Sequence, residues 1–437
     1  MRPRWKLFAE GLGPIGRAEV DIHPLLLFVG ENGAGKTALA SLLWGLYAMQ
    51  RELSLPSGPT LEACERWLAR RATARADEPP YALDDEDARL FTQLFNEILE
   101  HDATHLVRRI FNDPIASVSS LRVQNAGFSV RPRLTFQPGP DAPASTPSDT
   151  LHISSGLLRQ MGPAYQRHVL KRLAAHVAIG RSTLQDTTSS SLRRAGDPVF
   201  VPAGRTGFML LHRSVVLQRM ELRELGRTEP EDGPSRDLPS PVAQFLDMLD
   251  VGMGYERGPY DDEAALLEQC LDGTIELINR LGANDYHYHP TGRPSLPMSH
   301  APSVVTELAP LILVLRHLAS FPVLVIDEPT ALLHPRLHRK LAQAIVRLIR
   351  KGLYVWITTT SESFCRQINH FLRIGARIDR ARLLEELGHG EQDYLEIDDV
   401  AGYELTLEGG QTTVRSLPKF EGGLALSGFD EELSFAR

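Results

Sequence analysis

The chain has 437 residues, 42% of them hydrophobic and 23% charged, a composition typical of a globular protein of two or three domains. A net charge of −8 and an isoelectric point near 6.0 argue against attraction of the whole molecule to nucleic acid or to an anionic membrane, although a local basic groove stays open as an alternative. The three cysteines are widely separated, so we expect neither a disulfide framework nor a zinc site. No apolar stretch follows the basic N-terminus, and we therefore expect a cytoplasmic protein without a signal peptide.

The N-terminal region predicts a strand, a turn, a second strand, and then a strand that enters a phosphate-binding loop. The apolar runs Trp5–Phe8 and Leu25–Val29 flank a turn-rich segment, and a helical pattern occupies residues 37–49. Between the second run and this helix, Gly30–Thr37 matches G-x-x-x-x-G-K-[ST] at every fixed position. Glycines let backbone N–H groups turn towards a phosphate, and the following helix contributes the positive end of its dipole. The pattern therefore predicts a nucleoside triphosphate site.

Two side chains of this loop have predicted chemical roles. Lys36 would reach the β- and γ-phosphates, and the Thr37 hydroxyl would coordinate Mg²⁺. The residues predicted to bind the nucleotide are Gly30, Glu31, Asn32, Gly33, Ala34, Gly35, Lys36, Thr37 and Ala38.

The middle of the chain has weaker patterns. Residues 119–136 alternate in polarity and predict a hairpin that turns near Ala126 and Gly127. Helical patterns occupy residues 61–72, 84–109, 155–179, 208–225 and 264–270. Residues 199–201 predict a short strand, and the charged, proline-rich residues 227–241 predict a disordered loop. His287 and His289 share one face of a predicted strand, but no third ligand is visible, so we favour an exposed β edge over a metal site.

The last third predicts the acidic part of the nucleotide site. A helix over residues 302–318 leads into the buried strand Val323–Ile326, which ends in two carboxylates. A buried strand of an open α/β sheet presents its C-terminal end to the ligand. Asp327 would hold Mg²⁺, and Glu328 would polarise the water that attacks the γ-phosphate. A helix over 336–350, a strand over 353–358, a helix over 362–371 and strands over 403–407 and 412–414 are predicted to follow.

The segment Asp327–Pro335 reads D-E-P-T-A-L-L-H-P and resembles the Walker B and D-loop of ABC-type ATPases of the AAA family. The resemblance is greatest to the branch with OLD-like, RecF-like and SMC-like heads. Pro202–Arg205 resembles the P-A-x-R segment of that branch, and its first strands and C-terminal β region resemble residues 13–28 and 399–403. Both ends and the last third of the chain are covered well, and residues 51–195 poorly.

The resemblance implies an α/β fold: an ABC-type ATPase head that binds ATP and Mg²⁺ on a mixed central sheet with flanking helices, a helical second lobe and an α+β insert. The expected parts are the first portion of the ATPase lobe (1–50), the insert (51–197), a Q-loop-like region with the second lobe (198–300), and the signature, Walker B, switch and C-terminal β region (301–437). It also implies a homodimer or higher homo-oligomer in which two heads sandwich ATP.

Two positions depart from that pattern. Ser303 stands at the signature serine and would contact the ATP of the partner subunit, but Val304 replaces the usual glycine. Thr360 replaces the switch histidine and can donate a hydrogen bond without carrying charge. We assign Thr360 a catalytic role beside Glu328 and expect hydrolysis that is slow or partner-stimulated. Arg205 has two open interpretations, a phosphate contact and a structural contact at the lobe boundary, of which the structural one is favoured.

The resemblance leads to a functional hypothesis: an ATPase that dimerises as a nucleotide-dependent switch or sensor and controls a separate effector, a nuclease or toxin, in bacterial anti-phage defence. We see neither a TOPRIM nuclease domain after residue 375 nor heptads of coiled-coil arms over 208–300. One alternative is an ATP-dependent scaffold with negligible hydrolysis. The other is a RecF/SMC-like DNA repair ATPase.

Overall fold

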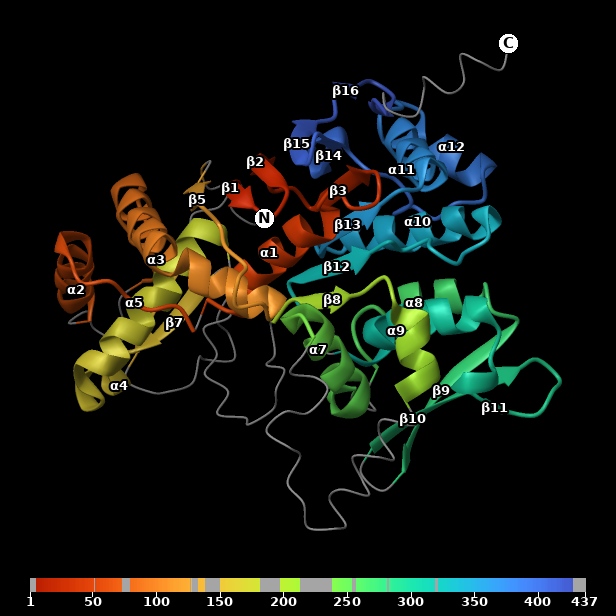
Figure 1. The fold of residues 1–437 in the computed structure, drawn as a ribbon, viewed down its shortest axis with the longest axis horizontal. Helices are drawn as coiled ribbons and strands as arrows, with labels where there is room; N and C mark the ends of the chain where they lie inside the picture. Colours follow the sequence, from red (N-terminus) through yellow and green to blue (C-terminus); the bar gives the residue numbers. More distant parts are fainter. Residues whose placement is uncertain are drawn as a thin grey trace.

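The computed structural model describes residues 5–50, 52–72, 79–125, 127, 133–137, 150–180, 197–212, 238–253, 257–280, 283–318 and 321–426. A nine-stranded mixed sheet runs through the centre of this part of the chain, and helices pack on both of its faces (Figure 1). The predicted mixed α/β class with a large central sheet and flanking helices is thereby confirmed. None of the described helices is long and apolar enough to cross a membrane.

The central sheet has the strand order β5-β1-β2-β15-β14-β3-β13-β12-β8. Five adjacent strands, from β14 to β8, run parallel, so their C-terminal ends meet at one edge. The strands are β1 (Trp5–Leu12), β2 (Ile15–Asp21), β3 (Leu25–Gly30), β5 (Ser120–Asn125), β8 (Val199–Val201), β12 (Val323–Asp327), β13 (Tyr354–Thr359), β14 (Val400–Glu408) and β15 (Gln411–Ser416).

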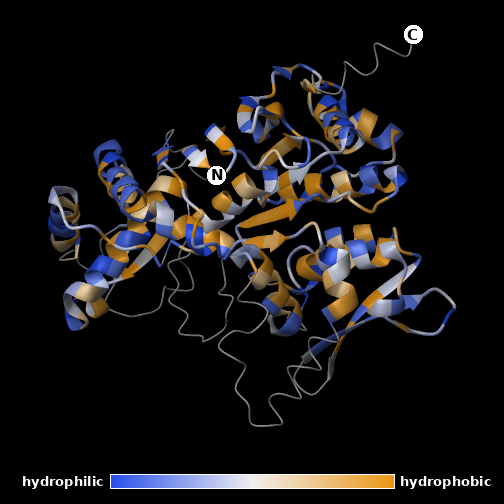
Figure 2. Ribbon diagram, viewed as in Figure 1, coloured by the Kyte–Doolittle hydropathy of each residue, from blue (hydrophilic) through white to orange (hydrophobic). Residues whose placement is uncertain are grey.

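Both faces of the sheet are buried at the parallel strands β3, β13, β12 and β8, where nearly every residue is buried. Successive side chains of these strands point to opposite sides of the sheet. In β3, Leu26 and Phe28 join one hydrophobic core, whereas Leu25, Leu27 and Val29 join the other. Figure 2 shows these strands as an apolar layer between helices with polar outer faces. The sequence of each of these parallel strands is therefore a nearly continuous apolar run.

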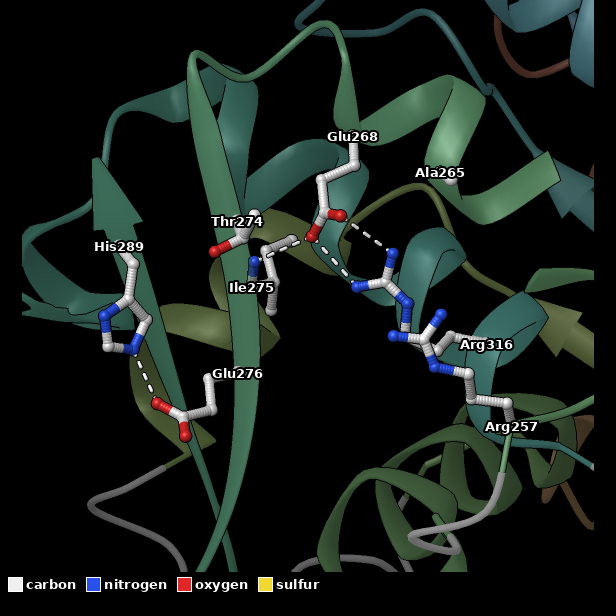
Figure 3. Close-up of a pocket in the computed structure, with 8 residues that line it drawn as sticks. All are labelled: Arg257, Ala265, Glu268, Thr274, Ile275, Glu276, His289 and Arg316. Carbon is white, nitrogen blue, oxygen red and sulfur yellow. Dashed lines mark hydrogen bonds and ion pairs between the residues drawn. The ribbon is translucent and has the colours of Figure 1, made fainter. Parts of the chain in front are cut away.

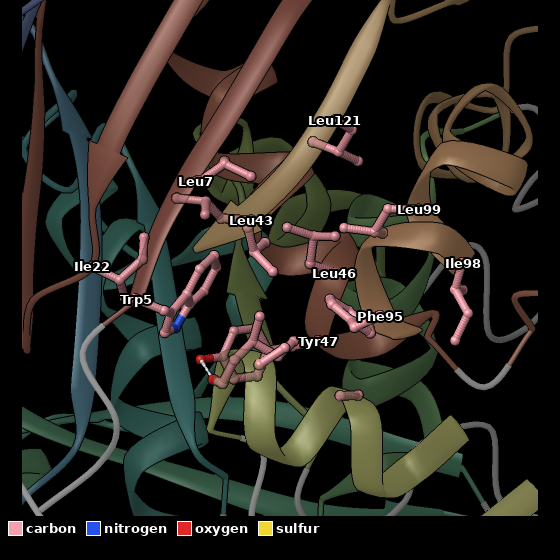
Figure 4. Packing of buried hydrophobic residues seen from close by; sticks show 14 of the residues in the cluster. Trp5, Leu7, Ile22, Leu43, Leu46, Tyr47, Phe95, Ile98, Leu99 and Leu121 are labelled. Carbon is pink, nitrogen blue, oxygen red and sulfur yellow. Dashed lines mark hydrogen bonds between the residues drawn. The ribbon is translucent and has the colours of Figure 1, made fainter. Parts of the chain in front are cut away.

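The first core lies under α1 (Lys36–Ala48), α2 (Pro59–Arg71), α3 (Asp85–Phe111), α4 (Ser155–Gln160) and α5 (Gly162–Ile179). Figure 4 shows its centre, where Tyr47 of α1 also donates a hydrogen bond of 2.6 Å to the Ile179 carbonyl. The second core lies under α7 (Ser240–Asp247), α8 (Asp261–Glu268), α9 (Ser303–His317), α10 (Pro335–Arg350), α11 (Glu362–Gly375) and α12 (Arg380–Glu386).

Three small sheets complete the described strands. Their members are β9 (Gly273–Arg280), β10 (Ala283–Pro290) and β11 (Leu296–Pro297); β4 (Tyr81–Ala82), β6 (Arg133–Gln137) and β7 (Thr150–Ser154); and β16 (Lys419–Phe420) with β17 (Gly423–Leu424). The short helical turns are Met248–Gly252, Met298–His300 and Ile397–Asp399.

The predicted hairpin over residues 119–136 is wrong. Its first half, β5, pairs antiparallel with β1 in the central sheet, and its second half, β6, pairs with β4 and β7 in another sheet. Alternating polarity determines which face of a strand is buried, but it does not identify the strand beside it. The predicted exposed edge at His287 and His289 is also wrong, because β10 is the middle strand of its sheet.

Three further predictions agree with the structure only in part or lie partly outside the described residues. The helical pattern over 155–179 is divided into α4 and α5 at Gly162, whose φ is +67°. Of the helix predicted over 208–225, only 208–212 lie within the described residues, and the helix begins at Arg205. Most of the predicted loop over 227–241 lies outside the described residues, although Ser240 begins α7.

Candidate functional site

The candidate site lies at the edge where β3, β13, β12 and β8 end. Strand register places Asp327 beside Thr358 and Thr359 beside Val29. Sequence segments far apart in the chain therefore leave neighbouring strands at one edge: the glycine-rich loop after β3, Thr360 after β13, Glu328 after β12 and Arg205 after β8. This edge carries every predicted site residue except Ser303.

The loop before α1 needs glycine at two positions for different reasons. Gly30 has φ +138°, and a Cβ there would lie 2.1 Å from the Leu405 carbonyl oxygen of β14. Gly35 has φ +86° and caps α1 with left-handed backbone, which costs a residue with a side chain about 1 kcal/mol or more. The first turn of α1 contains no acidic residue and receives no side-chain cap, so its N–H groups point to the loop without a competing carboxylate.

Lys36 folds back over its own loop. Its Nζ donates hydrogen bonds of 2.9 Å to the carbonyls of Gly30 and Glu31, and it lies 3.6 Å from Glu328 Oε1. Burial lowers the pKa of Lys36, whereas the charges of Glu328 and Asp327 oppose that shift. The ammonium is thus largely out of water and held by acceptors that a phosphate can replace.

Thr37 and Asp327, the two predicted Mg²⁺ ligands, are in direct contact. The Thr37 hydroxyl donates a 2.8 Å hydrogen bond to Asp327 Oδ1, and the Thr358 hydroxyl donates to the same oxygen. Among the described residues, no group of three or more His, Cys, Asp or Glu side chains is arranged to hold a metal. Mg²⁺ commonly takes one or two protein oxygens and completes its shell with substrate phosphates and water. The Thr37–Asp327 pair fits that mode.

Glu328 has an uncommon backbone conformation for a residue with a side chain, with φ +46°. Left-handed backbone of this kind costs about 1–3 kcal/mol and is concentrated at functional sites. The Glu328 N–H donates to the Thr358 carbonyl at 3.0 Å. The carboxylate accepts hydrogen bonds from the Thr360 N–H (3.0 Å) and the Thr360 hydroxyl (3.3 Å). Glu328 therefore lies between Thr360 and Lys36.

Ser303 is separate from this cluster. It is the exposed first residue of α9, and in the described part of the chain no hydrogen bond or ion pair joins its side chain to the glycine-rich loop. Val304 lies within the helix. A role for Ser303 towards a partner's nucleotide thus stays a prediction.

The contacts of Arg205 favour a structural role over a phosphate contact. Its side chain is 2% exposed and donates hydrogen bonds to the carbonyls of Asp327 (2.9 Å) and Glu328 (3.0 Å). Sequence reasoning missed Thr358, which contacts Asp327, and Glu307, which contacts Arg205. A lone carboxylate before the apolar stretch 308–315 was the available signal for Glu307.

A cavity of about 550 Å³ lies elsewhere, among α8, α9 and β9, and Figure 3 shows its lining. Arg316 donates two hydrogen bonds to Glu268, at 2.9 and 2.8 Å, and His289 Nε2 lies 2.6 Å from Glu276 Oε2. These ionic groups are paired with one another, and the loop before α1 does not line this cavity.

A family described as "AAA domain, putative AbiEii toxin, Type IV TA system" matches residues 210–362, about a third of the chain. The match includes Asp327, Glu328 and Thr360 but not the glycine-rich loop. No curated protein matches the chain.

Three solved structures of SMC heads are similar to the chain. An SMC head bound to the C-winged helix domain of ScpA is 13% identical, covers 95% of this chain and 97% of its own, and has a TM-score of 0.38. The head from Pyrococcus furiosus, with an extended coiled coil and the C-terminal domain of ScpA, is 13% identical over 100% of both chains, with a TM-score of 0.37. The head from Thermotoga maritima is 8% identical over 96% and 100%, with a TM-score of 0.33. Values this low do not carry function or topology over to this chain.

Proposed function

We propose that this chain binds ATP with Mg²⁺ at the shared strand edge, hydrolyses it, and acts in the cytoplasm as a dimerising nucleotide-dependent switch. The observation that carries the proposal is the contact cluster itself. Lys36 and Thr37 lie against Asp327 and Glu328, which follow them by some 290 positions in the chain. Phosphoryl transfer uses a phosphate cradle, a metal ligand and a residue that orients the nucleophile, and these four side chains can supply all three.

Each residue has one task in the proposed reaction. Lys36 binds the β- and γ-phosphates after it leaves the carbonyls of its own loop. Thr37 and Asp327 hold Mg²⁺, which supplies positive charge against the phosphate oxygens when bound. Glu328 orients water and accepts its proton, and Thr360 aims the Glu328 carboxylate through two hydrogen bonds.

Three features support a switch that works with partners. Ser303 is exposed at the start of α9, where the ATP of a second copy can reach it. The lack of a positively charged switch residue at Thr360 favours slow or stimulated hydrolysis. The matched family is described as a putative AbiEii toxin of a type IV toxin–antitoxin system, a description that supports a second protein component. That this component is an effector, a nuclease or toxin, which the chain controls in anti-phage defence is part of the proposal.

Glu328→Gln tests the proposal. We expect hydrolysis to fall by about 100-fold or more while ATP binding is kept, because the amide cannot accept the proton. With ATP and Mg²⁺, this variant should accumulate as a dimer in light scattering. Glu362→Gln is the matched control, because Glu362 is paired with Arg366 on α11 and should leave the rate unchanged.

The same assay separates the alternatives. A wild-type chain that does not bind ATP contradicts the proposal. Binding and dimerisation without hydrolysis favour the scaffold, and hydrolysis that requires DNA favours the repair ATPase.

A further inference from the structure

Arg205 uses every N–H of its guanidinium inside the protein. Nε donates to the Glu307 carbonyl at 3.1 Å. One terminal nitrogen donates to the carbonyls of Pro202 (3.1 Å) and Asp327 (2.9 Å). The other donates to the Glu328 carbonyl (3.0 Å) and to the Glu307 carboxylate. Five donors therefore meet five acceptors, and none is left for a phosphate.

Apart from Pro202, which follows β8, these acceptors belong to two segments with different positions in the site. Asp327 ends β12 and Glu328 follows it, whereas Glu307 lies in α9, four residues after the exposed Ser303. Glu307 is 1% exposed, and its second carboxylate oxygen accepts a 2.7 Å hydrogen bond from the Thr206 hydroxyl. The start of α9 is thus tied through one guanidinium to the carbonyl of the residue that orients water.

Arg205 also contacts the turn of α9 that contains a proline. Pro310 lies inside α9 and has no N–H to donate to the Thr306 carbonyl one turn earlier. Arg205 binds the neighbouring Glu307 carbonyl and so stabilises the turn that the proline weakens. Arg205 also donates to the carbonyl of Glu328, whose backbone is left-handed with φ +46°.

We infer that Arg205 and Glu307 are positioning residues that couple the Ser303 end of α9 to Glu328. When ATP held by a second copy of this chain docks on Ser303, the displacement of α9 is transmitted through Arg205 to the Glu328 carbonyl and aligns its carboxylate for hydrolysis. This inference rests on the proposed function and adds the connection between dimer closure and chemistry.

The other end of α9 offers a matched control. Arg316 is also largely buried and also binds a carboxylate, Glu268, with two hydrogen bonds (Figure 3). It binds Asp261 as well. Both carboxylates belong to α8, and none of these side-chain hydrogen bonds is to β12. Arg205→Lys and Arg316→Lys therefore make the same chemical change in two guanidinium–carboxylate pairs of one helix.

The experiment measures ATP affinity, kcat, KM and thermal unfolding for the wild-type chain and both variants. For Arg205→Lys we expect kcat to fall about tenfold or more, with ATP affinity within about twofold of wild type, because a misplaced carboxylate slows the reaction without removing the phosphate cradle. For Arg316→Lys we expect kcat and ATP affinity to stay near wild type.

Thr206→Val is a milder variant. It removes one hydrogen bond to Glu307 and should lower kcat several-fold, about the effect of one lost positioning contact. It also provides a milder test if Arg205→Lys does not fold.

A second measurement separates coupling from a loss of structure. Wild-type activity per chain should rise with protein concentration as dimers form, and Glu307→Gln, which keeps an acceptor for Arg205, should retain more of this rise than Glu307→Ala. Unchanged kcat in Arg205→Lys, or equal losses in both arginine variants, overturns the inference while the proposed function stands. Loss of ATP binding in Arg205→Lys also overturns it and favours the phosphate contact. Without ATP hydrolysis by the wild-type chain, both the inference and the proposed function fail.

Discussion

Two clusters of ionic side chains in this protein differ in what holds them together. In the cavity among α8, α9 and β9, Arg316 is paired with Glu268 and Asp261, and each partner is a side chain of a neighbouring element. At the strand edge, Lys36 binds carbonyls of its own loop and lies only 3.6 Å from Glu328. The first cluster is complete without a ligand, and the second keeps its cation on acceptors that a phosphate can replace. Whether the partners of a charged side chain can be replaced by a ligand is therefore a better guide to a ligand site than the volume of a cavity.

The largest effect is expected when the Lys36 side chain is removed from the strand-edge cluster. Lys36→Ala should weaken ATP binding by about 10- to 100-fold, because charge-assisted hydrogen bonds to the phosphates are lost. Titration calorimetry with ATP and Mg²⁺ measures this change. Lys171→Ala is the matched control: burial also lowers the pKa of Lys171, but its Nζ donates to the Leu53 carbonyl. Equal affinities in the two variants would contradict the assignment of Lys36.

An intermediate effect is expected from a substitution in the cavity among α8, α9 and β9. Glu268→Gln should lower the free energy of unfolding by about 1–3 kcal/mol, because the largely buried Arg316 loses its charged partner. ATP turnover should remain at the wild-type value. Chemical denaturation and a hydrolysis assay on the same preparation measure both quantities. A change in turnover comparable to that of Arg205→Lys would remove the distinction between the two clusters.

The smallest expected effect is a difference in pH dependence. Burial lowers the pKa of Lys36 below its ordinary 10.5, so ATP affinity should decline at a lower pH than an ordinary lysine would cause, because the ammonium deprotonates before it would in water. The hydrogen bonds to Glu268 and Asp261 raise the pKa of Arg316 above its ordinary value, so Arg316 keeps its charge over this pH range. Lys36→Arg should flatten the decline, because a guanidinium stays protonated. An identical pH profile in wild type and Lys36→Arg would show that another group is responsible.

The fold was predictable where the signal is local. Apolar runs such as Val323–Ile326 became buried strands, and Asp84, the first residue of the helix predicted over 84–109, caps α3 with a capping box. Prediction failed where a distant partner decided the structure. The alternation over 119–136 was real in each half, but the halves joined different sheets. Nor did the sequence indicate that β13 would lie between β3 and β12 and bring Thr358 against Asp327.

The sequence alone predicted the glycine-rich loop, because the pattern is one of contiguous residues: glycines that tolerate positive φ, followed at once by Lys36, Thr37 and a helix. It also fixed Asp327 and Glu328 at the end of a buried strand. Tertiary structure decided the rest. The hydrogen bond from Thr37 to Asp327, the two contacts from Thr360 to Glu328 and the buried position of Arg205 depend on strand order and on helix packing. Those contacts join residues far apart in the chain, so no local pattern records them.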